Sequence, residues 1–240
     1  MRNFDLRDRC IVITGAAGGL GREAAIMMRN KGARVHVLDV GRAAIEAMRA
    51  QYPDIICHEA DVSDAARIGQ IFAGIGRIDA LVNNASVQHE SSFEGADLDD
   101  WRRTIDVNLT GTFICIQQAL PHMGPGSTIL NVLTHEGRRT NLYAYAASKA
   151  GIKNLTQNLA IALSDRAISI NGIAYGAVYS QRNAHWQNDP EAVERALKRT
   201  PLHLILQPEE AAHQLVQFLE HSALYATGTV FDVSAGRSLT

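Results

Sequence analysis

The fold is decided by the stretch CIVITGAAGGLG at residues 10–21, which is followed by REAAIMM at residues 22–28. The first five residues are apolar and mostly β-branched, as is typical of a buried parallel strand. Residues 22–28 are good helix formers. A strand, a glycine-rich loop and a helix in this order predict a phosphate site, because the loop backbone and the helix N-terminus together bind anions.

The glycines of this loop have separate expected roles in binding a dinucleotide. Gly15 is expected to make the tight turn, Gly19 to let a pyrophosphate approach the backbone, and Gly21 to let the helix lie close to the sheet. Leu20, between the last two, is included in the expected cofactor site. A flexible turn is the alternative for any glycine-rich loop, but the position between a strand and a helix favours the nucleotide site.

A second expected strand, RVHVLD at residues 34–39, ends in an acid where a ribose-binding carboxylate is expected. Asp39 is therefore predicted to accept hydrogen bonds from the adenosine ribose hydroxyls. Its charge repels a 2′-phosphate, and Ala17 and Gly18 offer no cation in compensation, so the sequence favours NAD(H) over NADP(H). Two alternatives stay open: Arg42 supports phosphate binding, or Asp39 is only a helix cap.

Tyr145 and Lys149, in YAASK, are four residues apart and so share one face of a helix. A free tyrosine titrates at about pH 10, so a tyrosine that transfers protons at neutral pH needs a fixed positive charge beside it. Lys149 can supply that charge. The same spacing also occurs on solvated helix surfaces. The nucleotide site upstream makes a catalytic pair the favoured interpretation.

Together, the glycine-rich loop and the Tyr-Lys pair resemble the short-chain dehydrogenase/reductase family, and the resemblance extends over essentially the whole chain. It implies NAD(P) as the cofactor and a set of further binding residues. These are Asp61 and Val62 at the adenine, Asn84 and Ala85 in the NNA motif of the cofactor cleft, and Gly176, Val178 and Ser180 on the nicotinamide side.

The resemblance further implies a catalytic set of Asn108, Thr134, Tyr145 and Lys149. In the implied reaction, hydride moves between a secondary alcohol carbon and nicotinamide while Tyr145 transfers the proton. Thr134 hydrogen-bonds the reacting oxygen, Lys149 also binds the nicotinamide ribose, and Asn108 holds a water that leads to solvent. The expected protein is an NAD-dependent oxidoreductase for secondary alcohols or the matching ketones.

Several positions depart from the family's usual pattern. Thr134 replaces a serine, which keeps the hydroxyl but adds a methyl group that restricts its rotation. Ser86 replaces a glycine, Tyr175 replaces a proline, and residues 233–236 lack the usual Asp-Gly-Gly. These changes leave two alternatives open. One is an NAD-binding sensor or assembly protein without turnover, and the other, weaker one is a reductase of an imine or an activated double bond.

Strand and helix patterns alternate along the 240 residues without a linker or repeat, which predicts one α/β domain over residues 1–240. The expected architecture is a Rossmann-type, doubly wound parallel sheet of seven strands flanked by helices. The net charge of −2 gives no argument for nucleic acid or a membrane as partner. None of the nine histidines falls in a metal-ligand spacing, so no metal is expected.

Features outside the motifs bear on location and substrate. Three cysteines, a charged N-terminus and the lack of a long apolar run predict a cytoplasmic protein with a small-molecule substrate. The charged segment HEGRR at residues 135–139 favours a polar or anionic substrate. So do Arg182, His185 and Trp186, which lie in the expected substrate loop at about residues 178–205.

Two helical segments bear on assembly. Trp101 with the expected helix 102–121, and the expected helix 145–163, carry apolar stripes. The resemblance implies that such stripes join subunits of a homotetramer or dimer. The alternative is that they face the sheet as core.

Overall fold

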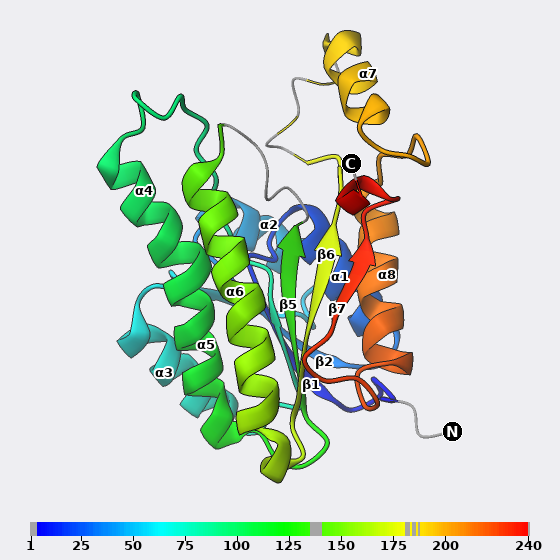
Figure 1. The fold of residues 1–240 in the computed structure, drawn as a ribbon. Coiled ribbons are helices and arrows are strands. Elements are labelled where there is room, and N and C mark those ends of the chain that lie inside the picture. Colours follow the sequence, from blue (N-terminus) through cyan, green and yellow to red (C-terminus); the bar gives the residue numbers. More distant parts are fainter. Residues whose placement is uncertain (1–3, 135–140, 181–182, 184–185, 187, 240) are drawn as a thin grey trace.

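The computed structural model describes residues 4–134, 141–180, 183, 186 and 188–239. In this part of the chain seven strands form one parallel sheet in the order β3-β2-β1-β4-β5-β6-β7 (Figure 1). The strands are β1 (Cys10–Thr14), β2 (Arg34–Asp39), β3 (Ile56–Glu59), β4 (Ala80–Asn83), β5 (Thr128–Thr134), β6 (Ser169–Tyr175) and β7 (Val230–Val233). The predicted Rossmann-type, doubly wound sheet of seven strands is therefore confirmed.

The α-helices of the described residues follow the strands in alternation. They are α1 (Gly19–Asn30), α2 (Arg42–Gln51), α3 (Ala65–Ile75), α4 (Leu98–Ile105), α5 (Gly111–Ala119), α6 (Tyr143–Ala162), α7 (Pro190–Lys198) and α8 (Pro208–His221). Among them there is no helix with the length and apolar character that crossing a membrane requires.

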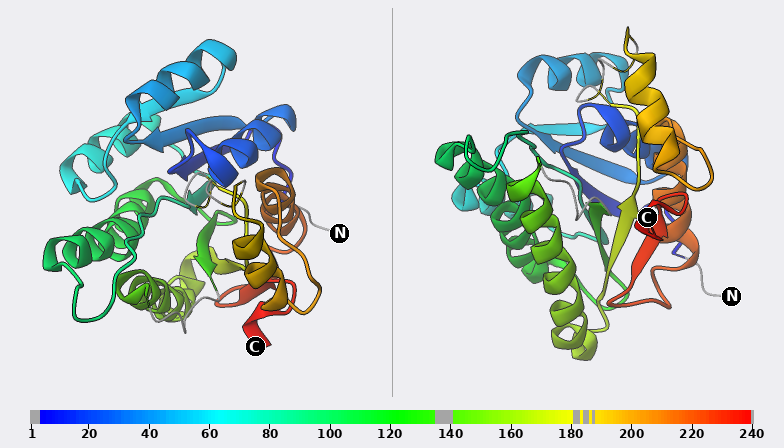
Figure 2. Two further views of the ribbon diagram at one scale, coloured as in Figure 1. Left: turned by 90° about the horizontal axis from the view of Figure 1, so that it is seen from above. Right: turned by 45° about the horizontal axis from the view of Figure 1, so that its top comes forward.

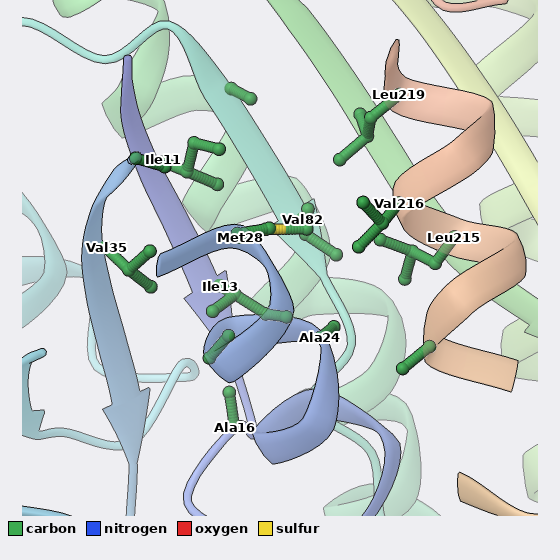
Figure 3. Packing of buried hydrophobic residues seen from close by; sticks show 14 of the residues in the cluster. Ile11, Ile13, Ala16, Ala24, Met28, Val35, Val82, Leu215, Val216 and Leu219 are labelled. Atoms are coloured by element: carbon green, nitrogen blue, oxygen red, sulfur yellow. The ribbon is translucent and has the colours of Figure 1, made fainter. Parts of the chain in front are cut away.

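The sheet is the middle of three layers (Figure 2). Because successive side chains of a strand point to opposite faces, each buried strand supplies two cores. In β1, Ile11 and Ile13 pack in the cluster formed with α1, α2 and α8, while Val12 packs in the cluster formed with α3, α5 and α6. Figure 3 shows the first cluster, where Met28 of α1 and Leu215 of α8 face the strands. Burial on both faces explains why the sequence of β1 is almost continuously apolar.

The position of the binding region follows from the strand order. The chain runs outward from β1 to β3 and then returns to β4, which pairs with the other side of β1. In open parallel sheets, ligands bind outside the carboxyl ends of the strands at such a reversal. The loops after β1 and β4 therefore flank the expected crevice.

The predicted helix 102–121 differs from the observed structure. Helix α4 begins at Leu98, and a π-helical turn, η1 (Asp106–Thr110), separates it from α5. Within this turn Asn108 is fully buried, and its side chain is bonded to a loop outside the helix. A π turn in the middle of a helix often marks a functional site, and here no local sequence pattern reveals it.

The apolar side chains of the two expected stripes lie partly in the core and partly on the outside of the chain. Ile114 and Ile116 of α5 and Ala160 of α6 are core residues under the sheet. Phe113 of α5 and Ile161 of α6 are exposed. Part of the apolar surface of these helices is thus core, as one alternative held, and part remains on the outside of this chain.

Helix α7 stands apart from the three layers, above the carboxyl ends of β6 and β7 (Figures 1 and 2). It packs through a small cluster of its own, in which Ala196 contacts Ala177 and Ile205. Asp189 caps its first turn by accepting a hydrogen bond from the N–H of Ala192. The described part of the expected substrate loop thus packs beyond the carboxyl ends of β6 and β7 through this small cluster.

Candidate active site

A cleft of about 630 Å³ lies across the carboxyl ends of the strands. All of the residues predicted to bind the cofactor or to act in catalysis line this cleft, with one exception. Its lining includes Gly15, Gly19, Leu20, Gly21, Asp39, Asp61, Val62, Asn84, Ala85, Thr134, Tyr145, Lys149, Gly176, Val178 and Ser180. Asn108 is the exception, because it is buried behind the cleft wall.

The glycine-rich loop is built as its sequence predicts. Gly15 has φ +61°, and a Cβ there would lie 2.6 Å from Cα of Ala85, so only glycine fits. A Cβ on Gly21 would lie 2.6 Å from Nδ2 of Asn84, which is why the helix approaches β4 so closely. Among the described residues, no side chain caps the N-terminus of α1. Its first N–H groups are therefore suited to hold phosphate oxygens.

Asn84 joins the glycine-rich loop to the end of β4. Its side-chain amide donates hydrogen bonds to the carbonyl oxygens of Thr14 at 3.0 Å and Gly15 at 2.7 Å. The N–H of Ala85 donates to Oγ1 of Thr14 at 3.1 Å. Beneath it, Asn83 donates to Asn131 of β5 at 2.8 Å. The NNA motif thus fixes three strand ends relative to one another.

Asp39 holds its carboxylate at the end of β2, in the wall of the cleft. Oδ2 accepts a hydrogen bond from the N–H of Ala17, and Oδ1 accepts one from the N–H of Gly41, both at 2.9 Å. Arg42 lies 3.3 Å from Glu46 and 3.9 Å from Glu59, and its side chain is 76% exposed. The cation of the phosphate-binding alternative, Arg42, is therefore already shared between two carboxylates.

Asp61 is engaged by two groups. Oδ1 accepts hydrogen bonds from the N–H and the hydroxyl of Ser63, and Oδ2 accepts one from Nη2 of Arg103 at 2.7 Å. Burial raises the pKa of the Asp61 carboxyl, but the bonds from Ser63 and Arg103 outweigh it, so that pKa lies below its usual value. Arg103 also lines the cleft, and no sequence motif pointed to it.

Tyr145 and Lys149 lie side by side in the first turns of α6. Only 9% of Tyr145 and 5% of Lys149 are exposed, and Nζ of Lys149 lies 5.5 Å from the centre of the Tyr145 ring. The ammonium also donates a hydrogen bond to the carbonyl of Val132 at 2.8 Å. The structure thus excludes the solvated-surface alternative for this pair and places a buried cation next to a buried phenol.

Thr134 ends β5 at the same cleft. Its hydroxyl donates a hydrogen bond to the carbonyl of Tyr175 on the neighbouring strand at 3.3 Å. Tyr175 also lines the cleft, but its hydroxyl is bonded elsewhere, because it donates to the carbonyl of Ala211 in α8 at 2.7 Å. Burial raises the pKa of Tyr175, so its hydroxyl stays protonated as a structural donor.

Asn108 connects the π turn to two neighbours. Its amide oxygen accepts from the N–H of Val87 at 2.8 Å, and its amide nitrogen donates to the carbonyl of Val87 at 2.9 Å and to the hydroxyl of Ser148 at 3.1 Å. Ser148 in turn donates to the carbonyl of Tyr145 at 2.7 Å. A continuous set of hydrogen bonds therefore links the loop after β4, the π turn and the turn of α6 that carries Tyr145.

The chain was compared with known proteins. A family model described as Enoyl-(Acyl carrier protein) reductase matches residues 15–238. The chain is 33% identical to 3beta-hydroxysteroid dehydrogenase 1 of Eggerthella lenta, over 98% of this chain and 95% of that protein. The chain belongs to the short-chain dehydrogenase/reductase family.

Two further proteins are similar to this chain over nearly its whole length. Cis-4-hydroxycyclohexanecarboxylate dehydrogenase of Sinomonas cyclohexanicum is 31% identical, over 95% of this chain and 96% of that protein. The structure of the Pseudomonas aeruginosa RhlG/NADP active-site complex is 29% identical, with a TM-score of 0.89 and 98% of each chain covered. This chain is an NAD(P)-dependent short-chain dehydrogenase/reductase that acts on CH–OH groups.

The substrate side of this short-chain dehydrogenase/reductase is described only in part. Residues 135–139, Arg182 and His185, which favoured a polar or anionic substrate, lie outside the described residues. Trp186 lines the cleft, as expected of the substrate loop. Sequence reasoning missed further polar or aromatic lining groups, because loops of irregular structure carry no periodic signal: Gln88, Glu90, Tyr179 and Asn183.

Proposed function

We propose that this short-chain dehydrogenase/reductase is an NAD-dependent enzyme that interconverts a polar secondary alcohol and its ketone. One observation carries the proposal: the buried Tyr145–Lys149 pair, the Thr134 hydroxyl, the glycine-rich loop and Asp39 line one continuous cleft. The nicotinamide cofactor, when bound, supplies the hydride acceptor or donor. The protein orients the reactants and moves the proton.

Each catalytic side chain has a role that fits its surroundings. Tyr145, as phenolate, accepts the hydroxyl proton in the oxidative direction, and as phenol it returns the proton in the reductive direction. The ammonium of Lys149 stabilises the phenolate through its charge in a site of low solvent access. Thr134 donates a hydrogen bond to the reacting oxygen, after its hydroxyl turns from the carbonyl of Tyr175.

The proposed role of Asn108 is to hold the relay water through its main chain and not through its side chain. Its side-chain amide already bonds Val87 and Ser148, so the amide is not the group that holds a relay water. The main-chain carbonyl of Asn108 accepts a hydrogen bond from Oγ1 of Thr112 at 2.6 Å. A carbonyl oxygen has two lone pairs, and we place the relay water on the second one.

The proposed preference for NAD(H) rests on Asp39 and Arg42. The Asp39 carboxylate is held in the cleft wall by two backbone N–H groups, so it is fixed where a 2′-phosphate would meet its charge. Arg42 is paired with Glu46 and Glu59 on the outside. The two hydrogen bonds also leave room for the ribose hydroxyls to donate to the same oxygens, because each carboxylate oxygen accepts more than one bond.

The remaining proposals concern the protein as a whole. We propose one domain over residues 1–240, a homo-oligomer formed through the exposed apolar side chains Phe113 and Ile161, and activity in the cytoplasm. All three cysteines are buried and free, which fits a reducing compartment. Light scattering of the purified protein tests the assembly. A monomer would contradict it.

The proposed reaction is tested by following nicotinamide absorbance with NAD and NADP against a panel of sugars, hydroxy acids, cyclic alcohols and steroids. Tyr145→Phe removes the proton-transferring hydroxyl and is expected to lower kcat by about a thousandfold or more, while NADH still binds. Tyr143→Phe is the matched control, because Tyr143 lies on the same helix but does not line the cleft. Equal activity of the two variants would contradict the role of Tyr145.

The alternative of an NAD-binding sensor or assembly protein predicts a different outcome of the same assay. NADH then binds to the wild-type protein, but no compound of the panel is oxidised or reduced. The weaker alternative predicts turnover of an imine or an activated double bond instead of an alcohol. The departures at Ser86, Thr134 and Tyr175 that suggested these alternatives leave the cleft open and its polar groups in place.

A further inference from the structure

The cleft has a region that the proposed catalytic set does not use. It lies between the loop after β4, residues 84–97, and the segment between β6 and α7. Both segments contribute side chains to the lining. These are Ser86, Gln88 and Glu90 from the first and Tyr179, Asn183 and Trp186 from the second. The substrate must contact these groups if its reacting carbon lies at Tyr145.

The first of these walls is anchored to the helices behind it. The Asn108 amide binds both the N–H and the carbonyl of Val87, which fixes the base of the loop. A ring nitrogen of His89 lies 3.1 Å from Oγ1 of Thr104, and the other lies 3.6 Å from the Asp100 carboxylate. His89 is therefore directed at α4, while its neighbour Glu90 lines the cleft.

Glu90 is also tied to the segment that leads into α6. Its Oε2 accepts a hydrogen bond from Nδ2 of Asn141 at 3.1 Å, and the N–H of Ser91 donates to the carbonyl of Asn141 at 3.1 Å. Asn141 lies four residues before Tyr145. The Glu90 carboxylate is thus held on the substrate side of the cleft, by the segment that leads to Tyr145. Its second oxygen can accept a hydrogen bond from a bound molecule.

The opposite wall is aromatic. Tyr179 and Trp186 meet edge to face, with ring centres 5.9 Å apart and an interplanar angle of 81°. Behind them lies the small apolar cluster that includes Ala177, Ala196 and Ile205. In the described part of the chain no ion pair neutralises Glu90. The substrate region therefore carries the Glu90 carboxylate on one segment and two aromatic rings on the other.

On the basis of the proposed function, we propose that Glu90 determines the substrate class. The substrate is a secondary alcohol or ketone on an apolar ring or chain whose far end carries a hydrogen-bond donor, a hydroxyl or an ammonium. A carboxylate accepts hydrogen bonds and cannot donate them, so it binds such donors and repels an anion. The anionic substrates that residues 135–139 favoured are thereby disfavoured at this end of the cleft.

The test uses three compounds that share one ring: 4-(hydroxymethyl)cyclohexanol, 4-aminocyclohexanol and 4-hydroxycyclohexanecarboxylate. For the wild type we expect kcat/KM to be about tenfold or more higher for the first two than for the carboxylate. Glu90→Gln should bring the three values to within about threefold, and Glu90→Lys should favour the carboxylate. Glu94→Gln is the matched control, because Glu94 is an exposed acid of the same loop that does not line the cleft.

Two results would overturn the role of Glu90 and leave the dehydrogenase function standing. One is a wild-type preference for the carboxylate, and the other is an unchanged order of the three compounds in Glu90→Gln. If no compound is turned over, binding of the three matching ketones to the NADH complex is measured by nicotinamide fluorescence. The same order of affinities supports Glu90 even though the reaction has failed, and no binding at all shows that the substrate class is wrong.

Discussion

Two aspartates of the cleft, Asp39 and Asp61, differ in how far neighbouring groups compensate their negative charges. Asp39 ends β2, Asp61 lies two residues after β3, and both line the cleft. Among the described residues, Asp39 accepts hydrogen bonds only from backbone N–H groups, whereas Asp61 is paired with the guanidinium of Arg103. The negative charge of Asp39 is therefore the less compensated of the two.

The Asp39 carboxylate is predicted to set the preference between NADH and NADPH. Asp39→Asn keeps the shape and one acceptor but removes the charge that repels a 2′-phosphate. We expect the ratio of the Kd values for NADPH and NADH to fall by about tenfold or more, which corresponds to about 1.4 kcal/mol. Fluorescence titration of both nucleotides measures this ratio. Glu209→Gln, which changes an exposed acid on α8 that does not line the cleft, is the control.

If Asp39 were only a helix cap, the result would differ. Both nucleotides would then lose affinity by the same factor, because the loss would come from a disturbed loop rather than from charge. The Glu209→Gln control would show how much of any effect arises from net charge alone.

At the scale of elements, the glycine-rich loop depends on contacts with β4. Gly15 and Gly18 lie three residues apart in one loop, but their surroundings differ. Gly15 has φ +61° and lies against Ala85, whereas Gly18 has extended backbone geometry and a Cβ there would have nothing within 4 Å. The two glycines therefore form a matched pair for measuring what close packing of loop and strand contributes.

We expect Gly15→Ala to lower the free energy of unfolding by about 2 kcal/mol or more, because a Cβ adds both left-handed backbone strain and a clash. Gly18→Ala should change it by less than about 0.5 kcal/mol. Urea denaturation without cofactor measures both, so that effects on binding do not enter. Similar losses for the two variants would show that the approach of the loop to Ala85 is not what requires glycine.

At the scale of the whole molecule, one buried pair of histidines couples folding to pH. His36 of β2 and His58 of β3 stack with ring centres 5.4 Å apart, and a nitrogen of each ring meets the other at 3.1 Å. Burial, together with the charges of His58 and Arg34, lowers the pKa of His36 to about 4. Burial and the charges of Arg67 and Arg49 also lower the pKa of His58.

The direction of the pH effect on stability follows because the folded protein favours the neutral form of His36. In the unfolded chain His36 binds a proton below about pH 6.5, whereas in the folded protein it stays neutral down to about pH 4. Its contribution is fully present above pH 6.5 and is lost as the pH falls toward 4. We expect a loss on the order of 2 kcal/mol from this group, measured by urea denaturation at pH 7 and pH 4.5.

A pair of variants separates this effect from the general acid sensitivity of carboxylates. His36→Phe keeps a ring beside His58 but cannot be protonated, so its stability should fall less between the two pH values than that of the wild type. His213→Gln, at an exposed position of α8, should behave like the wild type. Parallel pH curves for the wild type and His36→Phe would show that the histidine pair contributes nothing.

Much of the fold and of the site could be predicted from the sequence, because the determining signals are local. The apolar run of β1, the glycines after it and the good helix formers after those lie within 21 residues of the chain, from Cys10 to Asn30. Tyr145 and Lys149 are placed together by the helix repeat alone. The alternation of strands and helices predicts a parallel sheet, because parallel strands need crossover connections and these are usually helices.

Other parts of the site were decided only by the tertiary structure. Arg103 meets Asp61 across 42 residues, and Asn141 meets Glu90 across 51. The π turn at Asn108 depends on a loop 21 residues away. Such contacts arise from how the elements pack against one another, and no local pattern encodes the distance between side chains on different elements. The sequence by itself therefore determined the fold, the glycine-rich loop and the pairing of Tyr145 with Lys149, whereas the packing of loops and helices over the sheet decided which charges line the cleft.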